Sequence, residues 1–372
     1  MTRPIEAIIS LANLQHNFSV VRRLTPGARI MAVVKANAYG HGAVRVAGAL
    51  APLADAFGVA SLEEAVELRD AGIDKPIVLL SGVFGRAEMR EVARYGLGTV
   101  IHCAEQLQIL LDTQLCQPID VWLKLDTGMH RLGFTPDGFR QAAARLRTAE
   151  QVANRVFLSH LACADNSSED LNERQLTTFR NTIDELGVRS GDGLSLANSA
   201  ALLTRPDMHF DWVRPGVMLY GVNPLSGEVP LPEGVELRPV MTLHSRIVAL
   251  QTVPAGESVG YGEGWRAPGL LNSSSTSPSR IAVVAAGYGD GYPRHARNGC
   301  PVLVNGRPAA IAGRVSMDLL TVALGDDQQA KVGDTVTLWG EGLAVESIAA
   351  YSETIAYELL TGVNQRVKFS YE

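Results

Sequence analysis

Eight short apolar runs, separated by longer amphipathic stretches, constrain the fold of this chain more than any other feature. Such runs are typical of strands that are buried on both faces, as in parallel sheets covered by helices. Eight strand–helix repeats are enough to close a (β/α)₈ barrel, and an open, doubly wound sheet is the alternative. The runs are Ile30–Val34, Phe57–Ala60, Pro76–Leu80, Gly98–His102, Ile119–Lys124, Arg155–His160, Ser195–Asn198 and Trp212–Leu219.

The clearest intervening helix is predicted from Leu176, Phe179, Ile183 and Leu186, which are spaced by three and four residues. Gly187 follows at the position expected for a C-terminal cap.

A second domain is predicted after the barrel, because the pattern changes beyond Pro224. Strand-like runs punctuated by Gly and Pro indicate a mostly β domain. We place the barrel at residues 1–232 and the β domain at 233–372, and interpret the Ser-rich tract Asn272–Ser279 as a solvated loop. The β runs include Leu243–Leu250, Arg280–Ala285, Val302–Val304 and Thr335–Trp339.

Charge and cysteine content argue against several classes of protein. The chain has 33 basic and 39 acidic residues, a net charge of -6, which is opposite in sign to that of proteins that bind nucleic acids. We see no signal peptide and no apolar stretch of about 18 residues, so we expect a cytoplasmic protein that does not bind membranes. The four cysteines form no C-x-x-C pair, and we predict neither disulfides nor a metal site.

Polar residues follow the predicted barrel strands at their C-terminal ends, where barrels place their active sites. Lys35 comes directly after an apolar strand, and desolvation there would lower the pKa of its amine toward a nucleophilic range. The last two strands lead into Asn198-Ser199 and Arg214-Pro215-Gly216-Val217, in the customary position of a phosphate site. Together with His160, these groups suit a phosphorylated aldehyde cofactor held as a Schiff base.

Lys124 lies inside the predicted fifth strand. An unpaired ammonium in a barrel core is costly, so Lys124 must be paired or chemically modified. Asp126 is the simplest partner.

Two Gly-Tyr-Gly triplets, Gly260–Gly262 and Gly287–Gly289, occur in the β domain, followed by Gly313–Asp318 (GRVSMD). One such triplet is typical of a turn with a packed aromatic ring. Two triplets with the GRVSMD run indicate a functional role.

Together these motifs resemble the alanine racemase family, pyridoxal phosphate enzymes with a barrel and a C-terminal β domain. The resemblance covers essentially the whole chain: VVKANAYGHG (33–42), LKLDTGMHRLGF (123–134), SHLACAD (159–165), ANSAA (197–201), VRPGVMLYG (213–221) and the tyrosine and GRVSMD motifs. It implies that Lys35 forms the Schiff base with the cofactor. The cofactor-binding residues that it implies are Lys35, Tyr39, His160, Asn198, Ser199, Arg214, Gly216, Val217 and Tyr357.

The resemblance further implies interconversion of L-alanine and D-alanine, supplying D-alanine for the cell wall or catabolising it. Lys35 would serve one face of the substrate, and Tyr261 from the second subunit of a homodimer would serve the other. Arg131 and the partner's Met317 would contact the substrate. Lys124 matches a position that is carbamylated in many members, which would give it a negative charge that pairs with Arg131.

Two other functions remain as alternatives. Pyridoxal phosphate decarboxylases typically place an acidic residue at the ring nitrogen, whereas the resemblance places Arg214 there. Non-catalytic carriers of the cofactor resemble the barrel alone, whereas this chain has a further domain that contains Tyr261.

Overall fold

The computed structural model describes residues 3–166, 168–226, 229–268, 278–325 and 329–372. The chain divides into two compact units. The barrel unit comprises Gln15–Leu219 and Asn223–Leu237, and the β unit comprises Met1–Leu14, Tyr220–Val222 and Arg238–Glu372.

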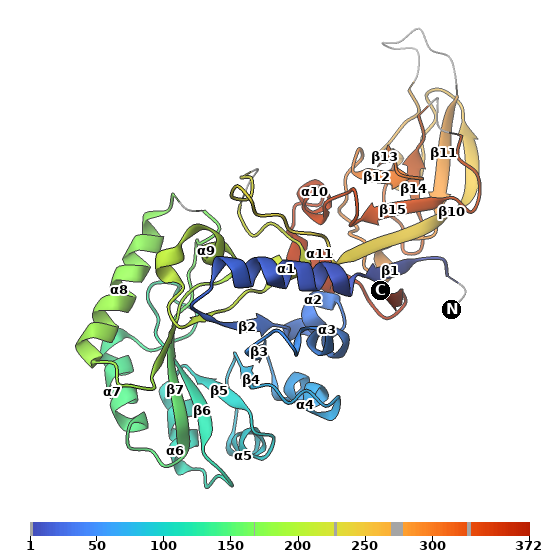
Figure 1. Cartoon of the computed structure of the whole chain (residues 1–372). Coiled ribbons are helices and arrows are strands. Elements are labelled where there is room, and N and C mark those ends of the chain that lie inside the picture. Colours follow the sequence, from blue (N-terminus) through green and yellow to red (C-terminus); the bar gives the residue numbers. More distant parts are fainter. Residues whose placement is uncertain (1–2, 167, 227–228, 269–277, 326–328) are drawn as a thin grey trace. The chain divides into compact units, whose positions relative to one another are not determined.

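The barrel unit contains the predicted (β/α)₈ barrel, with helices on the outside of its parallel strands (Figure 1). The first and last strands pair through Arg29 with Trp212 and Ile30 with Val213, which closes the sheet and excludes the open alternative. The strands are β2 (Arg29–Val33), β3 (Ala56–Val59), β4 (Ile77–Leu79), β5 (Gly98–Ile101), β6 (Ile119–Lys124), β7 (Val152–Leu158), β8 (Gly193–Ser195) and β9 (Trp212–Val213).

The helices of this unit follow the strands in alternation, and the predicted helix that ends at Gly187 is confirmed as α8. Gly187 adopts φ 65°, a left-handed conformation that glycine allows at the end of a helix. The helices are α2 (Lys35–Gly40), α3 (Ala43–Leu50), α4 (Leu62–Asp70), α5 (Arg86–Arg94), α6 (Ala104–Asp112), α7 (Pro136–Leu146), α8 (Asp170–Leu186) and α9 (Ser199–Thr204); α1 (Leu11–Leu24) has residues in both units.

Apolar side chains from all the strands except β8 fill the inside of the barrel. Trp122 and Trp212 meet edge to face with ring centroids 5.3 Å apart. Because the interior is packed, a ligand has room only at the ends of the strands. The cluster comprises Met31, Ala56, Val78, Val100, Trp122, Val156, Leu158 and Trp212, with Leu80 packed against it.

The predicted lengths of the last two barrel strands were wrong. β8 ends at Ser195, because the Asn198 side chain accepts a hydrogen bond from the backbone N–H of Ala201 and caps α9. β9 ends at Val213, and Pro215 cannot donate to a strand ladder. The chain continues into the 3-10 helix η2 (Val217–Tyr220). Residues 198–199 and 214–217 therefore lie beyond the ends of the strands, where Ser199 begins α9 and Val217 begins η2.

The β unit confirms the predicted mostly β domain. Its sheet has the order β11-β14-β13-β12-β15-β10-β1-β16, and β10 also pairs with β11. The bounds are β10 (Met241–Val253), β11 (Ser279–Val284), β12 (Pro301–Val304), β13 (Arg307–Ile311), β14 (Leu320–Ala323), β15 (Thr335–Trp339) and β16 (Lys368–Tyr371), with helices α10 (Val345–Tyr351) and α11 (Ala356–Gly362). Most of the tract Asn272–Ser279 lies outside the described residues.

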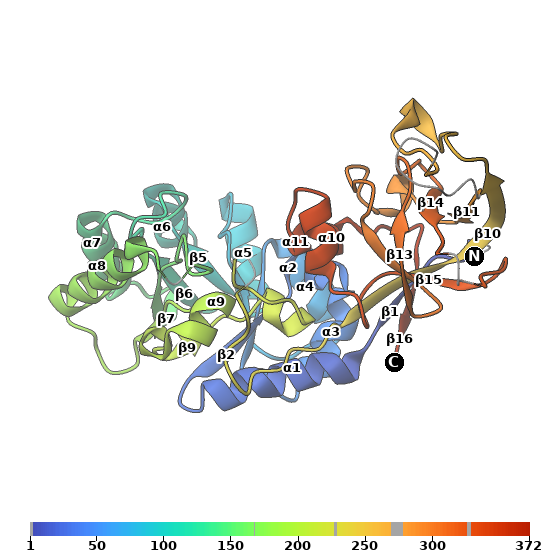
Figure 2. The ribbon, with the colours of Figure 1, turned by 90° about the horizontal axis from the view of Figure 1, so that it is seen from above.

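The N-terminal strand β1 (Glu6–Ile9) belongs to the β unit, although it precedes the barrel in the sequence. It pairs with β10 in the antiparallel and with β16 in the parallel sense, so the first and last strands of the chain are neighbours in one sheet (Figure 2).

Asp290 connects the chain ends to the second Gly-Tyr-Gly turn. Its buried carboxylate lies 2.7 Å from Arg3 Nη2 and 3.3 Å from Arg366 Nε. It also accepts a hydrogen bond from the backbone N–H of Gly287 at 3.0 Å. Since the backbone N–H of Gly289 donates to the carbonyl of Met317 at 2.8 Å, this carboxylate also stabilises the GRVSMD segment.

We expect Asp290→Asn to lower the free energy of unfolding by about 2–3 kcal/mol, because Arg3 and Arg366 would lose the buried carboxylate that they share as a counterion. Urea unfolding measures this change. Asp318→Asn is the control: Asp318 also pairs with Arg366 but is exposed, so the loss should be much smaller. Equal effects of the two substitutions would contradict the prediction.

Candidate active site

Basic side chains gather at the C-terminal ends of the barrel strands. Lys35 follows β2, Lys124 ends β6, His160 follows β7 and Arg214 follows β9. Arg131 lies in the loop after β6, and its charge lowers the pKa values of Lys35, Lys124 and His160. The structure thus brings these five predicted residues together, in a site with a strongly positive potential.

Lys35 is positioned by an unusual turn. The next four residues, Ala36 to Tyr39, all have φ values of 53–54°, in the left-handed region that residues other than glycine rarely adopt. The Lys35 side chain is exposed at the barrel mouth. Partial burial of its amine and the charge of Arg131 nevertheless lower its pKa below the usual 10.5, while Glu64 raises it.

The same turn brings Tyr39 to the backbone of Gly216. A Cβ atom at residue 216 would lie only 2.5 Å from Tyr39 Oη, so any residue larger than glycine would push the tyrosine hydroxyl from this position. The Ser199 hydroxyl accepts a hydrogen bond from the backbone N–H of Gly216 at 2.9 Å. Two hydroxyl groups therefore lie beside the buried backbone of the Gly216–Val217 segment, a cradle suited to a phosphate group.

Asn198, another predicted cofactor-binding residue, also has a structural role. Its side-chain oxygen is engaged in capping α9.

Arg214 is held rigidly in the barrel. It is only 6% exposed, and its guanidinium donates to Ser195 Oγ at 2.5 Å and to the carbonyl of Ser159 at 2.7 Å. Ser195 Oγ in turn donates to the carbonyl of Trp212 at 2.9 Å. Burial lowers the pKa of Arg214 to about 10, so the group stays protonated at neutral pH. Ser195 and Ser159 were not among the predicted site residues, although a polar residue within or beside an apolar strand is a signal of such a role.

His160 lies beside this arginine, with Nδ1 3.4 Å from Arg214 Nη2. Burial and the charges of Arg214, Lys124, Arg131 and Lys35 hold its pKa well below 6.5. The imidazole is therefore neutral at pH 7, and the positive charge of the His160–Arg214 pair resides on the arginine. Since arginine only donates, Nδ1 is the acceptor and Nε2 carries the hydrogen.

Lys124 is buried, with 8% of its surface exposed. Asp126 directs its carboxylate to its own loop, where it accepts from the backbone N–H groups of Gly128 and His130 and contacts the His130 ring. Burial, followed by the charges of Arg214 and Arg131, lowers the pKa of Lys124 to about 8. Asp126, the partner predicted from the sequence, acts on this lysine through its charge, which raises the pKa of Lys124 but does not outweigh burial and the two arginines.

The β unit contains the remaining predicted site residues, Tyr261, Met317 and Tyr357. Tyr261 is 70% exposed and Met317 is 53% exposed, and Tyr357 on α11 is also exposed. The Gly-Tyr-Gly triplets do form turns, but their tyrosines are not packed into the core of this chain. Such exposed aromatic and apolar side chains are typical of interaction surfaces.

The two Gly-Tyr-Gly turns of the β unit both pack against the GRVSMD segment. The turn at Val259–Gly262 packs against Gly313 and Arg314, and the turn at Gly287–Gly289 packs against Ser316 and Met317. The sequence showed these motifs only as separate segments.

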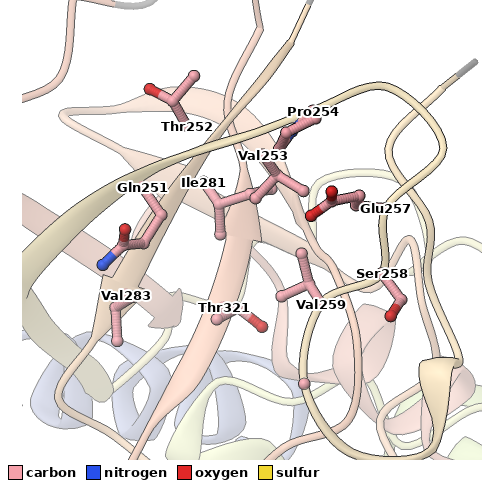
Figure 3. A pocket seen from close by; sticks show the side chains of 11 residues that line it. Gln251, Thr252, Val253, Pro254, Glu257, Ser258, Val259, Ile281, Val283 and Thr321 are labelled. Carbon is pink, nitrogen blue, oxygen red and sulfur yellow. The ribbon is translucent and has the colours of Figure 1, made fainter.

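A groove of about 290 Å³ in the β unit is lined in part by Val253, Val259, Ile281 and Thr321 (Figure 3). Its lining includes none of the predicted site residues. Among the residues that the structure describes, no cluster of three or more His, Cys, Asp or Glu side chains could hold a metal ion. None of the helices in the described ranges is long and apolar enough to cross a membrane.

Comparison with known proteins matches both parts of the chain. Residues 9–224 match the model of the alanine racemase N-terminal domain, and residues 240–371 match that of the C-terminal domain. An alanine racemase of Chromohalobacter salexigens is 48% identical over 372 residues, covering 100% of this chain and 98% of that protein. A catabolic alanine racemase of Pseudomonas aeruginosa is 46% identical over 98% of each.

Comparison with solved structures points to the same family. The crystal structure of a biosynthetic alanine racemase from Pseudomonas aeruginosa has a TM-score of 0.91 and 45% identity, with complete coverage of both chains. The alanine racemase from Acinetobacter baumannii has the same TM-score at 36% identity, also with complete coverage. With both domains matched and the predicted barrel residues gathered at one mouth, the chain belongs to the alanine racemase family.

Proposed function

We propose that this protein interconverts L-alanine and D-alanine, using pyridoxal phosphate bound at the barrel mouth of a homodimer. The observation that carries the proposal is the placement of the Lys35 amine at the mouth that also holds the Tyr39–Ser199–Gly216 cradle and the Arg214–His160 pair. The family relationship supports the same activity.

The residues at the mouth fit this cofactor. The hydroxyls of Tyr39 and Ser199 and the backbone of Gly216 and Val217 would bind its phosphate, and a side chain at residue 216 would displace the Tyr39 hydroxyl. Tyr357 remains a predicted phosphate ligand. Lys35, with its lowered pKa, would attach the aldehyde. When bound, pyridoxal phosphate withdraws electrons from the substrate and thereby acidifies its Cα–H.

Arg214 would face the ring nitrogen. It keeps its proton at neutral pH, so it binds this nitrogen without protonating it as a carboxylic acid would. An arginine in this position would leave the ring nitrogen unprotonated, which would favour rapid return of the proton to Cα over side reactions. This choice of residue distinguishes the site from that expected of a decarboxylase.

Racemisation requires removal of a proton on one face of Cα and delivery on the other. Lys35 would serve one face, because its lowered pKa leaves more of the amine neutral and able to accept a proton. Tyr261 of the partner subunit would serve the other, and its exposure on this chain supports such a role. The partner's Met317 and this chain's Arg131 would bind the substrate.

We further propose that Lys124 is carbamylated. With a pKa of about 8, part of this amine is neutral near physiological pH. The neutral nitrogen would bond to the carbon of CO₂ and release one proton, which converts a buried cation into an anion. The resulting carboxylate would pair with Arg131.

We expect ¹³C-bicarbonate to give a carbamate resonance in the NMR spectrum of the protein, and Lys124→Gln to lack it. Losing this anion should raise KM for alanine about tenfold, because Arg131 would lose its partner. Lys331→Gln, an exposed lysine, is the control. A spectrum without the resonance would reject carbamylation.

All four cysteines are free thiols, which supports a reducing compartment, and we propose that the enzyme works in the cytoplasm.

The activity is tested by incubating the protein with pyridoxal phosphate and a panel of L-amino acids, followed by chiral chromatography. We expect D-alanine to form from L-alanine until the two enantiomers are equal, with other small amino acids converted more slowly. If no D-alanine forms, the proposed function is wrong.

A further inference from the structure

We propose that Glu64 is a positioning residue for Lys35: its carboxylate clamps the left-handed turn that carries the amine and acts on the charge of that amine. The inference rests on the proposed function for the role of Lys35, whereas the clamp itself is a feature of the described chain.

The turn after Lys35 needs support from outside. Left-handed backbone is unfavourable for residues with a Cβ atom, and four of them in succession, Ala36 to Tyr39, accumulate this strain. Strained segments persist only where the surrounding structure determines them, and they concentrate at functional sites. Lys35 and Tyr39 lie at the two ends of this segment, so its shape sets the separation of the amine from the phosphate cradle.

The second half of the turn is held by its own residues. The Asn37 side chain accepts a hydrogen bond from the backbone N–H of Ala43 at 2.8 Å. The buried His41 ring places Nδ1 2.9 Å from the carbonyl oxygen of Tyr39 and 3.1 Å from that of Ala38. These contacts leave the first residue of the turn, Ala36, to be held from elsewhere.

Glu64 holds that residue. Its Oε1 accepts a hydrogen bond from the backbone N–H of Ala36 at 2.7 Å, and Oε2 accepts one from the backbone N–H of Ala60, also at 2.7 Å. Ala36 directly follows Lys35, and Ala60 directly follows β3. The carboxylate thus ties the start of the turn to the end of the neighbouring strand, from its position in the first turn of α4.

Glu64 also differs in charge from the other groups that act on Lys35. The charge of Arg131 lowers the pKa of this amine, and the charge of Lys35 in turn lowers the pKa values of Lys124 and His160. Glu64 is the acidic group that raises it. Removing its charge should therefore lower the pKa of Lys35 further.

Both functions require a carboxylate. Each oxygen accepts one backbone N–H, so Glu64→Gln would place an amide NH₂ against one of these donors and break that bond. The substitution also removes the charge with almost no change in volume. Glu67→Gln is the matched control, because Glu67 is an exposed acid on the same helix.

Two measurements on the cofactor-free protein test the proposal. Hydrogen exchange followed by mass spectrometry should show that the segment 35–42 exchanges about tenfold faster in Glu64→Gln. The rate of covalent capture of pyridoxal phosphate, followed against pH and trapped with borohydride, reports the neutral amine. Its inflection should move to lower pH by about half a unit to one unit, because the pKa of Lys35 falls. Glu67→Gln should match the wild type in both.

Each result decides a separate point. Wild-type exchange in Glu64→Gln would overturn the clamp, and faster exchange with an unchanged pH inflection would reduce Glu64 to a structural role. Faster exchange throughout the barrel would indicate general unfolding and would also overturn the proposal. If the wild type captures no pyridoxal phosphate, the proposed function fails, while the exchange comparison still decides whether Glu64 holds the turn.

Discussion

Lys35→Ala is expected to lose racemisation by at least about 10³-fold and to lose covalent attachment of pyridoxal phosphate. The substitution removes both the amine that binds the aldehyde and the base on one face of Cα, and a general base alone contributes about 10²–10⁴-fold. Lys35 and Lys124 both have lowered pKa values, but Lys35 is the one exposed at the barrel mouth, whereas Lys124 is buried. Chiral chromatography measures the activity, and the mass of the intact protein after borohydride treatment measures attachment.

Lys331→Ala is a suitable control, since this lysine is exposed in the β unit. It should gain the mass of the cofactor as the wild type does. If Lys35→Ala still gained that mass at one specific lysine, the attachment site would have to be reassigned.

Tyr261→Phe is expected to reduce racemisation by about 10³-fold while leaving binding of pyridoxal phosphate intact. The phenolic oxygen is the only atom removed, so the loss reports its proton transfer. With Lys35 still present, one enantiomer of alanine should continue to exchange its Cα proton with deuterium from the solvent, whereas the other should not. This asymmetry separates a missing base from a general loss of activity.

The control is Tyr351→Phe, because Tyr351 is also an exposed tyrosine of the β unit but belongs to none of the site motifs. Full activity of Tyr261→Phe would reject the two-base assignment and would favour a carrier of the cofactor. Equal exchange of both enantiomers would place both transfers on one base.

The local sequence pattern was sufficient to predict much of the architecture. Alternating apolar runs predicted eight barrel strands and a mostly β second domain, since the spacing of apolar residues reflects which face of an element is buried. It also indicated that Lys35, Ser199 and Arg214 follow strands, and therefore meet at one mouth, because all parallel strands end on the same side. The motifs also identified the family, because each of them is continuous in the sequence and needs no tertiary contact to be seen.

Tertiary structure alone revealed the partners of these residues. No local pattern distinguishes Glu64 from its neighbour Glu63, since acidic residues are common in the first turn of a helix, and only folding places one of them on Ala36 and Ala60. Likewise, β1 pairs with β16 from the opposite end of the chain, and Asp290 meets Arg3 and Arg366. The left-handed turn and the altered pKa values have the same origin, because burial and charge are summed over groups that are distant in sequence and close in space.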